Sequence, residues 1–386
     1  MRIVFAGIIG RYPWGGVTWC SLMYLLGLRQ LGHSVYYLED TCECNYDPEI
    51  NSIATDPRYA LGYIHRSLAP FGLGERWCYI DYQGRYYGIP RERWEEVCRS
   101  ADLFLVLSGG CWVWREHYLH VPVKAFIDSD PGFTQCALNE ALDSRQSEPR
   151  KRWYVDFFGA YDRLFTFGSN IGQPGCEIPT VGFRWLPTWQ PVDTTLWAPP
   201  NGAAPARREW TTVMTWVIES FKDIGGYKDQ EFLGILDLAR NSAEIGGPPF
   251  ELAINGPAAF LREHGWRCVD AFGASADLWR YHNYLSTSRG EFGVAKHTYV
   301  KSRSGWFSDR TACYLASGRP AVVQDTGTGE TLPVGEGLLT WRSADEALDA
   351  LMRVEADYAR HSAAARQLAV EHFDARRVLK SLLDRC

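Results

Sequence analysis

Apolar residues recur along the chain in short runs, each followed by a glycine-rich or polar loop and then by a stretch with helical spacing. The first run, Arg2–Ala6, leads into the loop Gly7–Gly16 and then into Val17–Leu31, where leucines recur at helical spacing. Val35–Leu38 is the next apolar run. Continuous apolar runs predict buried strands, and a spacing of three to four residues predicts helices. The chain is therefore predicted to open with a strand, a loop, a helix and a second strand.

The rest of the first half repeats this rhythm. The pattern predicts a helix near Pro57–Ala69 and a hairpin over Tyr79–Tyr87. Further short strands are predicted at Ala101–Leu107, Val123–Ile127, Arg163–Phe167 and Thr180–Phe183. Strands that alternate with loops and helices are typical of a doubly wound α/β sheet.

The second half shows the same alternation after a proline-rich break at Pro187–Arg208. Strands are predicted at Thr211–Ile218, Phe250–Ile254, Ala321–Val323 and Gly337–Trp341, and helices at Ala258–His264 and Ser275–Tyr284. The segment Gly290–Lys296 fits either a helix or a strand. We expect an N-terminal domain over residues 1–190, a linker over 191–209, a second domain over 210–365 and a final helix over 366–386.

The stretch Gly305–Glu330 carries helix, turn, strand and loop signals without interruption. Ser308 is a good N-cap for a short helix over Arg310–Ala316, and Ser317 and Gly318 end that helix before the next strand. The loop after the strand is rich in glycine. Helix N-termini attract anions, and loops at the carboxyl ends of parallel strands line ligand crevices. This stretch is therefore predicted to offer two ligand edges.

Composition restricts the classes of partner and compartment. The 386 residues carry a net charge of −6, which gives no overall positive field for nucleic acid or an anionic membrane. No apolar run approaches the length of a membrane span, and Met1–Gly10 is typical of a first strand rather than of a signal peptide. The eleven cysteines form no CxxC pairs, and His117 and His120 lack further ligands, so we predict no metal site and a cytoplasmic chain with reduced thiols.

Four sequence runs carry a family resemblance: SRGEFGVAK, SGWFSDR, YLASGRP and QDTG, all within residues 284–341. This region resembles the donor site of nucleotide-sugar-dependent glycosyltransferases of the GT-B type, and it is similar to bacterial spore-coat glycosyltransferase-like proteins. The resemblance implies two Rossmann-like doubly wound domains that face a central cleft. It also implies a donor nucleotide held by the C-terminal domain, an acceptor held by the N-terminal domain, and a last helix that returns to the first domain.

The sequence departs from this family at two positions. Retaining members with a two-glutamate motif carry glutamates where this chain has Gly305 and Cys313. The motif therefore assigns no stereochemical outcome here.

A nucleotide sugar brings a diphosphate leaving group, whose developing charge needs cations or N–H groups. The candidate donor-binding residues are Lys296, Lys301, Ser308, Asp309, Arg310, Thr326, Gly327 and Glu330. The N–H groups at the helix start and mobile side chains of Arg310 and the neighbouring lysines suit the phosphates, and Glu330 suits sugar or ribose hydroxyls. The alternatives are an ordinary helix cap with solvated basic residues and a surface carboxylate. No metal or other cofactor is predicted beside the nucleotide sugar, which serves as co-substrate.

An inverting transfer needs a base for the acceptor hydroxyl, and Asp130, then Asp128, follow a buried strand where such a base belongs. Acidic residues before Pro-Gly also form ordinary turns. The acceptor-side candidates are Trp14, Gly15, Gly16, Trp112 and Trp114. Their alternatives are a tight turn and ordinary core packing.

The leading hypothesis is transfer of a sugar from a nucleotide diphosphate donor to an acceptor hydroxyl bound by the N-terminal domain. The first alternative is a degenerate GT-B protein that binds a sugar nucleotide or carbohydrate without transfer. The second is a GT-B-like phosphorylase or epimerase. The sequence assigns neither the donor base, the sugar and the acceptor nor an oligomeric state.

Overall fold

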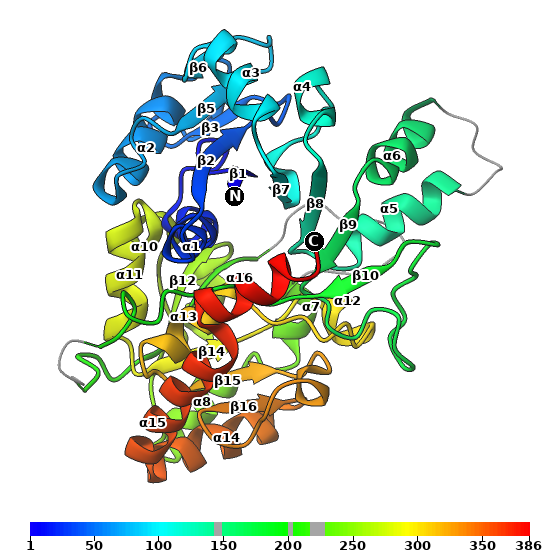
Figure 1. The fold of residues 1–386 in the computed structure, drawn as a ribbon. Helices are drawn as coiled ribbons and strands as arrows, with labels where there is room; N and C mark the ends of the chain where they lie inside the picture. The colour runs from blue at the N-terminus through cyan, green and yellow to red at the C-terminus, as the bar shows by residue number, and fades with distance from the viewer. Residues whose placement is uncertain (143–148, 200–203, 217–227) are drawn as a thin grey trace. The chain divides into compact units, whose positions relative to one another are not determined.

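The computed structural model describes residues 1–142, 149–199, 204–216 and 228–386 (Figure 1). By their contacts, the residues divide into two compact units. Unit 1 comprises Met1–Phe167, Pro179–Pro191 and Ala375–Cys386, and unit 2 comprises Gly168–Ile178 and Val192–Asp374. The domain limits predicted at residues 190, 209 and 365 stay predictions.

Unit 1 is built on an eight-stranded sheet in the order β10-β9-β8-β7-β1-β2-β5-β6, in which only the β5–β6 pair is antiparallel. The strands are β1 (Arg2–Ala6), β2 (Ser34–Glu39), β5 (Trp77–Ile80), β6 (Tyr86–Gly88), β7 (Leu103–Leu107), β8 (Val123–Asp128), β9 (Arg163–Thr166) and β10 (Trp185–Pro187). The central strands are buried on both faces, which explains why they read as continuous apolar runs. The strand order reverses between β1 and β7.

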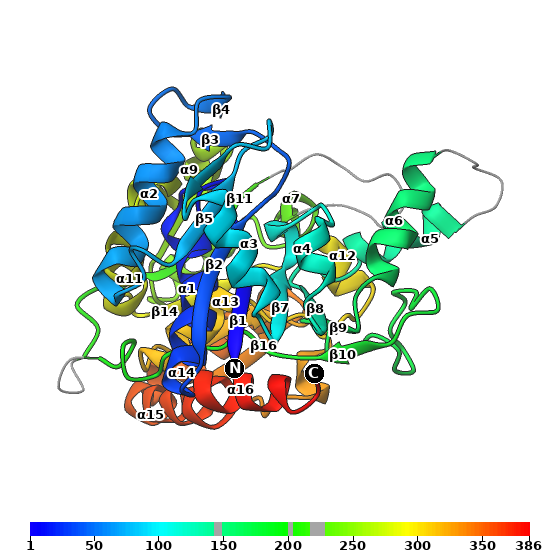
Figure 2. The ribbon, with the colours of Figure 1, turned by 45° about the horizontal axis from the view of Figure 1, so that its top comes forward.

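The helices of unit 1 are α1 (Gly15–Gln30), α2 (Arg58–Leu68), α3 (Arg91–Arg99), α4 (Glu116–Leu119), α5 (Phe133–Leu142), α6 (Pro149–Gly159) and α16 (Ala375–Leu383). A small hairpin, β3 (Asn45–Asp47) and β4 (Ser52–Ala54), follows β2. Helix α1 packs closely on α16, because a Cβ atom on Gly27 would lie 2.5 Å from Leu379 and 2.8 Å from Ala375. Figures 1 and 2 both show α5 and α6 side by side beyond β8 and β9.

Unit 2 is built on a six-stranded parallel sheet in the order β13-β12-β11-β14-β15-β16. Its strands are β11 (Trp210–Thr215), β12 (Phe250–Asn255), β13 (Arg267–Asp270), β14 (Gly290–Gly293), β15 (Ala321–Gln324) and β16 (Leu338–Trp341). Counted within the unit, this order is the 3-2-1-4-5-6 of Rossmann folds, which reverses between the first and fourth strands. The reversal therefore lies between β11 and β14.

The helices of unit 2 are α7 (Lys228–Leu233), α8 (Leu238–Glu244), α9 (Ala258–Glu263), α10 (Ala271–Ser275), α11 (Leu278–Thr287), α12 (His297–Lys301), α13 (Asp309–Ala316), α14 (Ala344–Ala356) and α15 (Tyr358–Leu368). Aromatic side chains fill the core beside the sheet. Phe292 stacks on Trp341 at 5.6 Å and also contacts Phe250 and Trp266. Part of the large tryptophan content is thus core packing.

Most predicted elements are confirmed, including the helix near Pro57–Ala69 and the Tyr79–Tyr87 hairpin. The strand predicted at Thr180–Phe183 is wrong, because Val181 and Gly182 have positive φ angles of 49° and 79° that no strand adopts. The last two residues of the strand predicted at Thr211–Ile218 lie outside the described residues.

The helix predicted at Ser275–Tyr284 is confirmed as α11, although α11 begins three residues later and a separate short helix, α10, ends at Ser275. Helix α10 ends at Ser275, and Asp277 caps α11 by accepting from the backbone N–H groups of Trp279 and Arg280. An aspartate followed by apolar residues is itself a helix-start signal, so the break was readable from the sequence.

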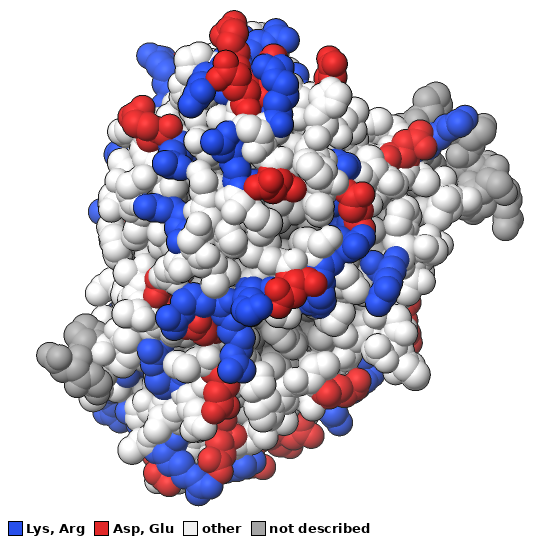
Figure 3. All heavy atoms as spheres, viewed as in Figure 1, with Lys and Arg blue, Asp and Glu red and all other residues white. Residues whose placement is uncertain are grey.

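Charged side chains of both signs are mixed over the face shown in Figure 3. Among the described residues, no helix is long and apolar enough to cross a membrane. The described residues also contain no group of three or more His, Cys, Asp or Glu side chains placed to hold a metal ion.

Candidate functional site

Helix α13 begins as predicted. The Ser308 hydroxyl accepts from the backbone N–H of Arg310 at 3.3 Å, which caps the first turn. The helix ends at Ala316. Gly318, just after it, has a φ of +65° in the left-handed region that glycine favours, and the backbone N–H of Arg319 donates to the carbonyl of Tyr314 at 2.9 Å. Strand β15 follows at once, so the predicted succession of helix, turn and strand is confirmed.

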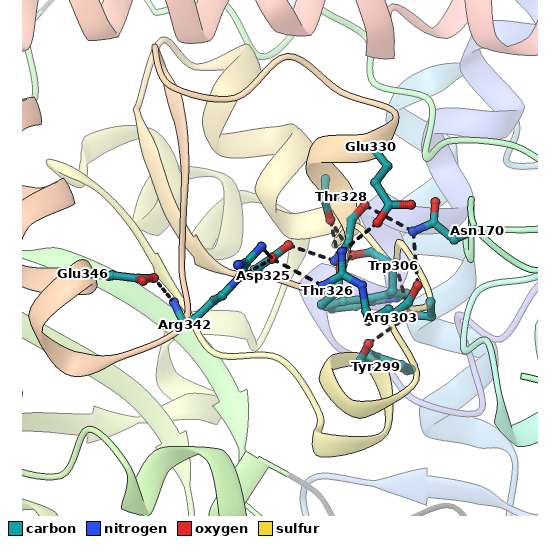
Figure 4. Close-up of polar contacts among 12 residues, drawn as sticks. Asn170, Tyr299, Arg303, Trp306, Asp325, Thr326, Thr328, Glu330, Arg342 and Glu346 are labelled. Carbon is teal, nitrogen blue, oxygen red and sulfur yellow. Dashed lines mark hydrogen bonds and ion pairs between the residues drawn. The ribbon is translucent and has the colours of Figure 1, made fainter. Parts of the chain in front are cut away.

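The loop after β15 is fastened to the segment before α13 (Figure 4). The hydroxyls of Thr326 and Thr328 donate to the carbonyl of Trp306 at 2.7 and 3.2 Å. Gly327 has a φ of +89°, and its N–H donates to Asp325 at 2.8 Å. Thr326 and Gly327 therefore hold the loop in place, and their expected contact with a donor stays a prediction.

Glu330 is engaged in an ion pair rather than standing alone. Its carboxylate lies 2.6 Å from the guanidinium of Arg303, and its side chain is half exposed (Figure 4). The carboxylate of Asp325, five residues earlier in the chain, accepts a hydrogen bond from Nε of Arg342 at 2.8 Å. These pairs brace the loop, and a hydroxyl ligand of Glu330 would have to share the carboxylate with Arg303.

Arg310 lies at the point where the strand order of unit 2 reverses. Its Nη1 donates to the carbonyl of Val213 in β11 at 2.7 Å, and its Nε donates to Glu291 in β14 at 2.7 Å. Burial works against its charge, but the Glu291 carboxylate raises the pKa of Arg310 above its ordinary value. The expected mobile cation is therefore a fixed one, held between two strands.

Two lysines bring further positive charge to Arg310. Lys296 is the N-cap residue of α12, directly after β14, and Lys228 is the first residue of α7, which follows β11 in the chain. Burial, Arg310 and Lys296, in that order, lower the pKa of Lys228 to about 7. Glu291 and Asp309 act in the opposite direction with less effect. Three cations from three elements thus gather at one edge of the sheet.

Helix α7 is held over this edge by Glu231. One oxygen of its carboxylate lies 2.5 Å from Nδ1 of His297 in α12, and the other accepts from the amide of Gln324 in β15. Gln324 in turn accepts from the backbone N–H of Ala295 at 3.1 Å. Glu231 therefore ties α7 to α12 and β15.

Lys228, Glu231 and Gln324 are not among the residues predicted from the sequence. Strand order supplies the missing signal, because it makes β11 the neighbour of β14 and so brings residues that follow β11 to Arg310. Lys301, in contrast, lies exposed at the last position of α12. Its predicted donor role has no supporting contact among the described residues.

The cavity at this edge of the sheet is small, and the fixed side chain of Arg310 is part of its lining. It measures about 20 Å³ and is lined by residues of the β14 and β15 ends and the start of α13, among them Ala295, Ser308 and Thr326. A second hollow in unit 2, of about 880 Å³, lies at the amino ends of β11 and β12. There Arg207 and Arg267 already pair with Glu251, so its charges are largely compensated.

Gly305 and Cys313 stand at the two positions of the two-glutamate motif, and their surroundings show what each position accommodates. Gly305 has a φ of +70°, and a Cβ atom there would lie 2.2 Å from the Ser169 hydroxyl and 2.8 Å from the Asn170 side chain. Cys313 is buried, and burial raises the pKa of its thiol well above the ordinary value. A glutamate does not fit at Gly305, and the neutral thiol of Cys313 does not replace a carboxylate.

In unit 1, Asp128 is buried and its oxygens are engaged. They accept from Thr134 at 3.1 Å, Gln135 at 2.8 Å and Thr166 at 3.1 Å. Burial raises the pKa of Asp128 to about 6. Asp128 thus ties β8 to β9 and α5, whereas Asp130 is exposed in the loop after β8 and stays the first candidate for a base.

The loop Gly7–Gly16 is held by a carboxylate from the neighbouring strand. Glu39, at the end of β2, is fully buried and accepts from the N–H groups of Gly10 (2.8 Å) and Arg11 and from the Tyr37 hydroxyl (2.8 Å). Burial raises the pKa of Glu39 to about 7. Glu39 directly follows the predicted strand Val35–Leu38, and the sequence pattern gave no sign that it holds this loop.

The acceptor-side aromatics occupy two places in unit 1. Trp14 precedes α1, which begins at Gly15 and Gly16, and packs edge-on against Tyr46 at 5.6 Å. Trp112 stacks on Tyr154 at 6.2 Å, and the indole N–H of Trp114 donates to the carbonyl of Phe157 at 3.0 Å. These last two tryptophans pack against α6 and are half-buried, and their acceptor role stays a prediction.

No family model and no curated protein matches the chain. Several solved structures do match the chain. An alpha-glucosyltransferase in complex with UDP and a 13-mer DNA matches with a TM-score of 0.57 at 12% identity, over 100% of this chain and 99% of the other. AviGT4, a glycosyltransferase involved in avilamycin A biosynthesis, matches with a TM-score of 0.53 at 12% identity, over 100% and 96%. HepE of Anabaena in complex with UDP matches with a TM-score of 0.53 at 11% identity, over 100% and 99%.

At such identities the likeness concerns the fold. Together with the two sheets, it confirms the prediction of a GT-B fold with two Rossmann-like, doubly wound domains. The predicted central cleft and the similarity to spore-coat proteins stay predictions.

Proposed function

We propose that the chain is a glycosyltransferase that moves a sugar from a nucleotide diphosphate donor to an acceptor hydroxyl. One observation carries the proposal. Lys228, Lys296 and Arg310 converge at the carboxyl edge of unit 2, between β11 and β14, where the strand order reverses. In open α/β sheets ligands bind at this point, and three cations there suit a diphosphate.

The cations would stabilise the leaving group. Cleavage of the glycosidic bond of a nucleotide sugar leaves negative charge on the diphosphate oxygens, and fixed positive groups lower the barrier because they need no reorganisation. Arg310 is already held by Glu291 and Val213, so it supplies such a fixed charge. We propose that Lys228, Lys296 and Arg310 take the place of a divalent metal ion and that the reaction requires no such ion.

UDP is the first nucleotide to test. Two of the matching structures named above contain it, the alpha-glucosyltransferase and HepE. For this chain the uracil base and a hexose are proposals that rest on the shared fold.

The acceptor is proposed to bind unit 1, at the carboxyl edge where its own strand order reverses between β1 and β7. Trp14 and the loop Gly7–Gly16 follow β1, and Trp112 follows β7. Asp130 is the proposed base for the acceptor hydroxyl. The mixed charges of Figure 3 and the net charge of −6 do not favour a nucleic acid acceptor.

The alternative is a protein that binds a sugar nucleotide without transfer. Gly305 and Cys313 favour it, since neither position of the two-glutamate motif holds a carboxylate. Binding of UDP with neither transfer nor hydrolysis of any UDP-sugar would support this reading.

A two-part experiment tests the proposal. Thermal shift and calorimetry with UDP measure binding, and mass spectrometry of UDP-glucose and other UDP-sugars incubated with a panel of hydroxyl acceptors measures transfer and hydrolysis. We expect binding that Lys296→Met weakens and Lys380→Met leaves unchanged, because Lys380 is an exposed residue of α16 paired with Asp384. Absence of both binding and turnover with every nucleotide sugar would contradict the proposal.

A further inference from the structure

The short turn that carries Glu330 is fastened on both sides by two neighbouring residues from a distant part of the chain. Before the turn, the amide group of Asn170 donates to the carbonyl of Gly327 at 3.2 Å. After the turn, the hydroxyl of Ser169 lies 3.1 Å from the hydroxyl of Thr331. Glu330 therefore stands between two points that the same dipeptide holds.

Asn170 also holds the segment that carries the ion-pair partner of Glu330. Its amide nitrogen donates to two backbone carbonyls, that of Gly327 and that of Arg303 at 3.1 Å (Figure 4). The backbone N–H of Asn170 donates to the carbonyl of Ser304 at 3.0 Å. Asn170 is only 3% exposed, so one buried amide joins the segment of Arg303 to the loop of Glu330.

Two glycines make room for this amide. A Cβ atom at Gly327 would lie 2.6 Å from Nδ2 of Asn170, and a Cβ atom at Gly305 would lie 2.8 Å from its Oδ1. Both glycines have positive φ angles, +89° and +70°, which side chains rarely allow. Backbone therefore encloses the amide and leaves it a single place.

The ion pair between Arg303 and Glu330 does not fix the carboxylate by itself. The two side chains are 42% and 49% exposed, and ion pairs at such exposure contribute little, because water screens them and the ordering of two long side chains costs entropy. Arg303 also has a φ of +50°, which is uncommon for a residue with a side chain. The geometry of the pair therefore depends on the two backbone segments that Asn170 holds.

The loop adjoins the proposed diphosphate site. Thr326 and Thr328 line the same small cavity as Arg310, and Glu330 lies two residues beyond Thr328. A nucleotide sugar carries hydroxyl groups on either side of its diphosphate, on the ribose and on the transferred sugar. A donor whose diphosphate faces Arg310 would thus bring hydroxyl groups close to this loop.

We propose that Asn170 is a positioning residue of the donor site, which holds Glu330 in the orientation that accepts a hydroxyl group of the nucleotide sugar. Arg303 contacts Oε1 of Glu330, and among the described residues Oε2 has no hydrogen-bond partner, so a donor hydroxyl would bind there. The proposal rests on the proposed function, since it assumes that a nucleotide sugar binds at this edge of unit 2.

Calorimetric titration of the full chain with UDP and with UDP-glucose measures the two contributions. Glu330→Gln removes the charged acceptor and should weaken binding by about tenfold, as the loss of a charge-assisted hydrogen bond predicts. Asn170→Ala releases both segments and should weaken binding of the same ligand by about fivefold, because the carboxylate is no longer preorganised. A loss with both ligands assigns the hydroxyl to the ribose, and a loss with UDP-glucose alone assigns it to the sugar.

The double variant distinguishes positioning of Glu330 from a general structural role. If Asn170 acts through Glu330, Asn170→Ala adds little once residue 330 is glutamine, and the double variant should bind within about twofold of Glu330→Gln. Independent effects would multiply to about 50-fold. Ser242→Ala is the matched control, since buried Ser242 donates to the carbonyl of Pro248 at 2.9 Å in a part of unit 2 before β12, and it should leave both affinities unchanged.

Arg303→Asn gives a second route to the same answer if Asn170→Ala does not fold. The side chain of Arg303 is half exposed, and asparagine tolerates a positive φ better than most residues but is too short to form the ion pair. We expect affinity about threefold lower than in the parent chain, and no further loss when Arg303→Asn is combined with Glu330→Gln.

The outcomes keep the positioning role apart from the proposed function. A parent chain that binds neither UDP nor UDP-glucose would overturn the positioning role and the proposed UDP site together. Binding of UDP that Glu330→Gln or Asn170→Ala leaves unchanged with both ligands would overturn only the positioning role. Losses that multiply in the double variant would do the same, because Asn170 would then act independently of Glu330.

Discussion

The sheets of both units reverse their strand order at one point, but the two units carry opposite charges at their carboxyl edges. In unit 2 the reversal between β11 and β14 gathers Lys228, Lys296 and Arg310. In unit 1 the strands that flank the central β1–β7 pair end in buried carboxylates, Glu39 of β2 and Asp128 of β8. The fold fixes where a ligand edge lies, and the residues that follow each strand decide what that edge binds.

The buried ionisable side chains at the two edges also differ in how their charge is stabilised. Arg310 is ion-paired, so it keeps its charge despite burial. Glu39 and Asp128 are surrounded by hydrogen-bond donors rather than by cations, and burial raises both of their pKa values, to about 7 and about 6. Unit 2 thus gathers positive charge at its edge, whereas in unit 1 Glu39 holds the loop Gly7–Gly16 and Asp128 ties β8 to β9 and α5.

Insertion of a side chain at Gly305 should have the largest effect. Gly305→Glu places a Cβ atom against Ser169 and Asn170 in a backbone conformation that disfavours side chains, and we expect unit 2 to lose at least about 3 kcal/mol of stability. Chemical unfolding followed by tryptophan fluorescence measures this. Gly335→Glu is the matched control, since its φ is also positive but nothing lies within 4 Å of its added Cβ. Equal losses in both variants would show that strain rather than crowding excludes the glutamate.

Asp128, at the end of β8, and Asp130, in the loop after it, should have different roles. If Asp130 is the base, Asp130→Asn lowers kcat by about 100-fold or more with little change in stability. Asp128→Asn should instead cost about 1 kcal/mol of stability, because its oxygens bond Thr134, Gln135 and Thr166. Steady-state kinetics and urea unfolding of both variants give the comparison. A larger loss of kcat in Asp128→Asn than in Asp130→Asn would reverse the assignment.

Removal of one cation from unit 2 should weaken the donor site. We expect Lys296→Met to reduce UDP affinity about 10- to 100-fold, since a charge-assisted hydrogen bond contributes about 1.5–3 kcal/mol. Lys380→Met should leave it unchanged. Calorimetric titration of both variants and the parent chain with UDP at one fixed pH measures the effect. A Lys296→Met affinity within twofold of the parent chain would remove Lys296 from the site.

Glu39 should make unit 1 less stable as the pH rises. Its pKa is about 7 in the folded chain and about 4.5 in the unfolded chain, so between these values the folded state binds more protons and stability falls with pH. We expect the stability difference between the parent chain and Glu39→Gln to shift by about 3 kcal/mol from pH 4.5 to pH 7.5. Urea unfolding at both pH values checks this, and a shift of the opposite sign would show that Glu39 is stabilised as a carboxylate.

The sequence predicts strands and helices well where several local signals agree. Arg2–Ala6 and the run from Ser308 to Val323 fold as expected, because apolar runs, an N-cap and a terminal glycine all agree there. The pattern fails at Thr180–Phe183, where a positive φ at Val181 and Gly182 makes a turn from residues that suit a strand.

The candidate site was predictable only in part. Arg310 lies in the stretch Gly305–Glu330, where the local signals are strongest, and Lys296 ends the run SRGEFGVAK, so the sequence points to both. Lys228 reaches them only through strand order, which is a long-range property of the sheet. The fixed state of Arg310 likewise depends on Glu291 and Val213, which lie 19 and 97 residues away in the chain.

A crystal structure of the chain with UDP tests the central claim most directly. The account predicts diphosphate oxygens about 3 Å from the side-chain nitrogens of Lys228 and Lys296, at the edge between β11 and β14. UDP bound instead in the hollow of Arg207 and Arg267, at the amino ends of β11 and β12, would contradict it.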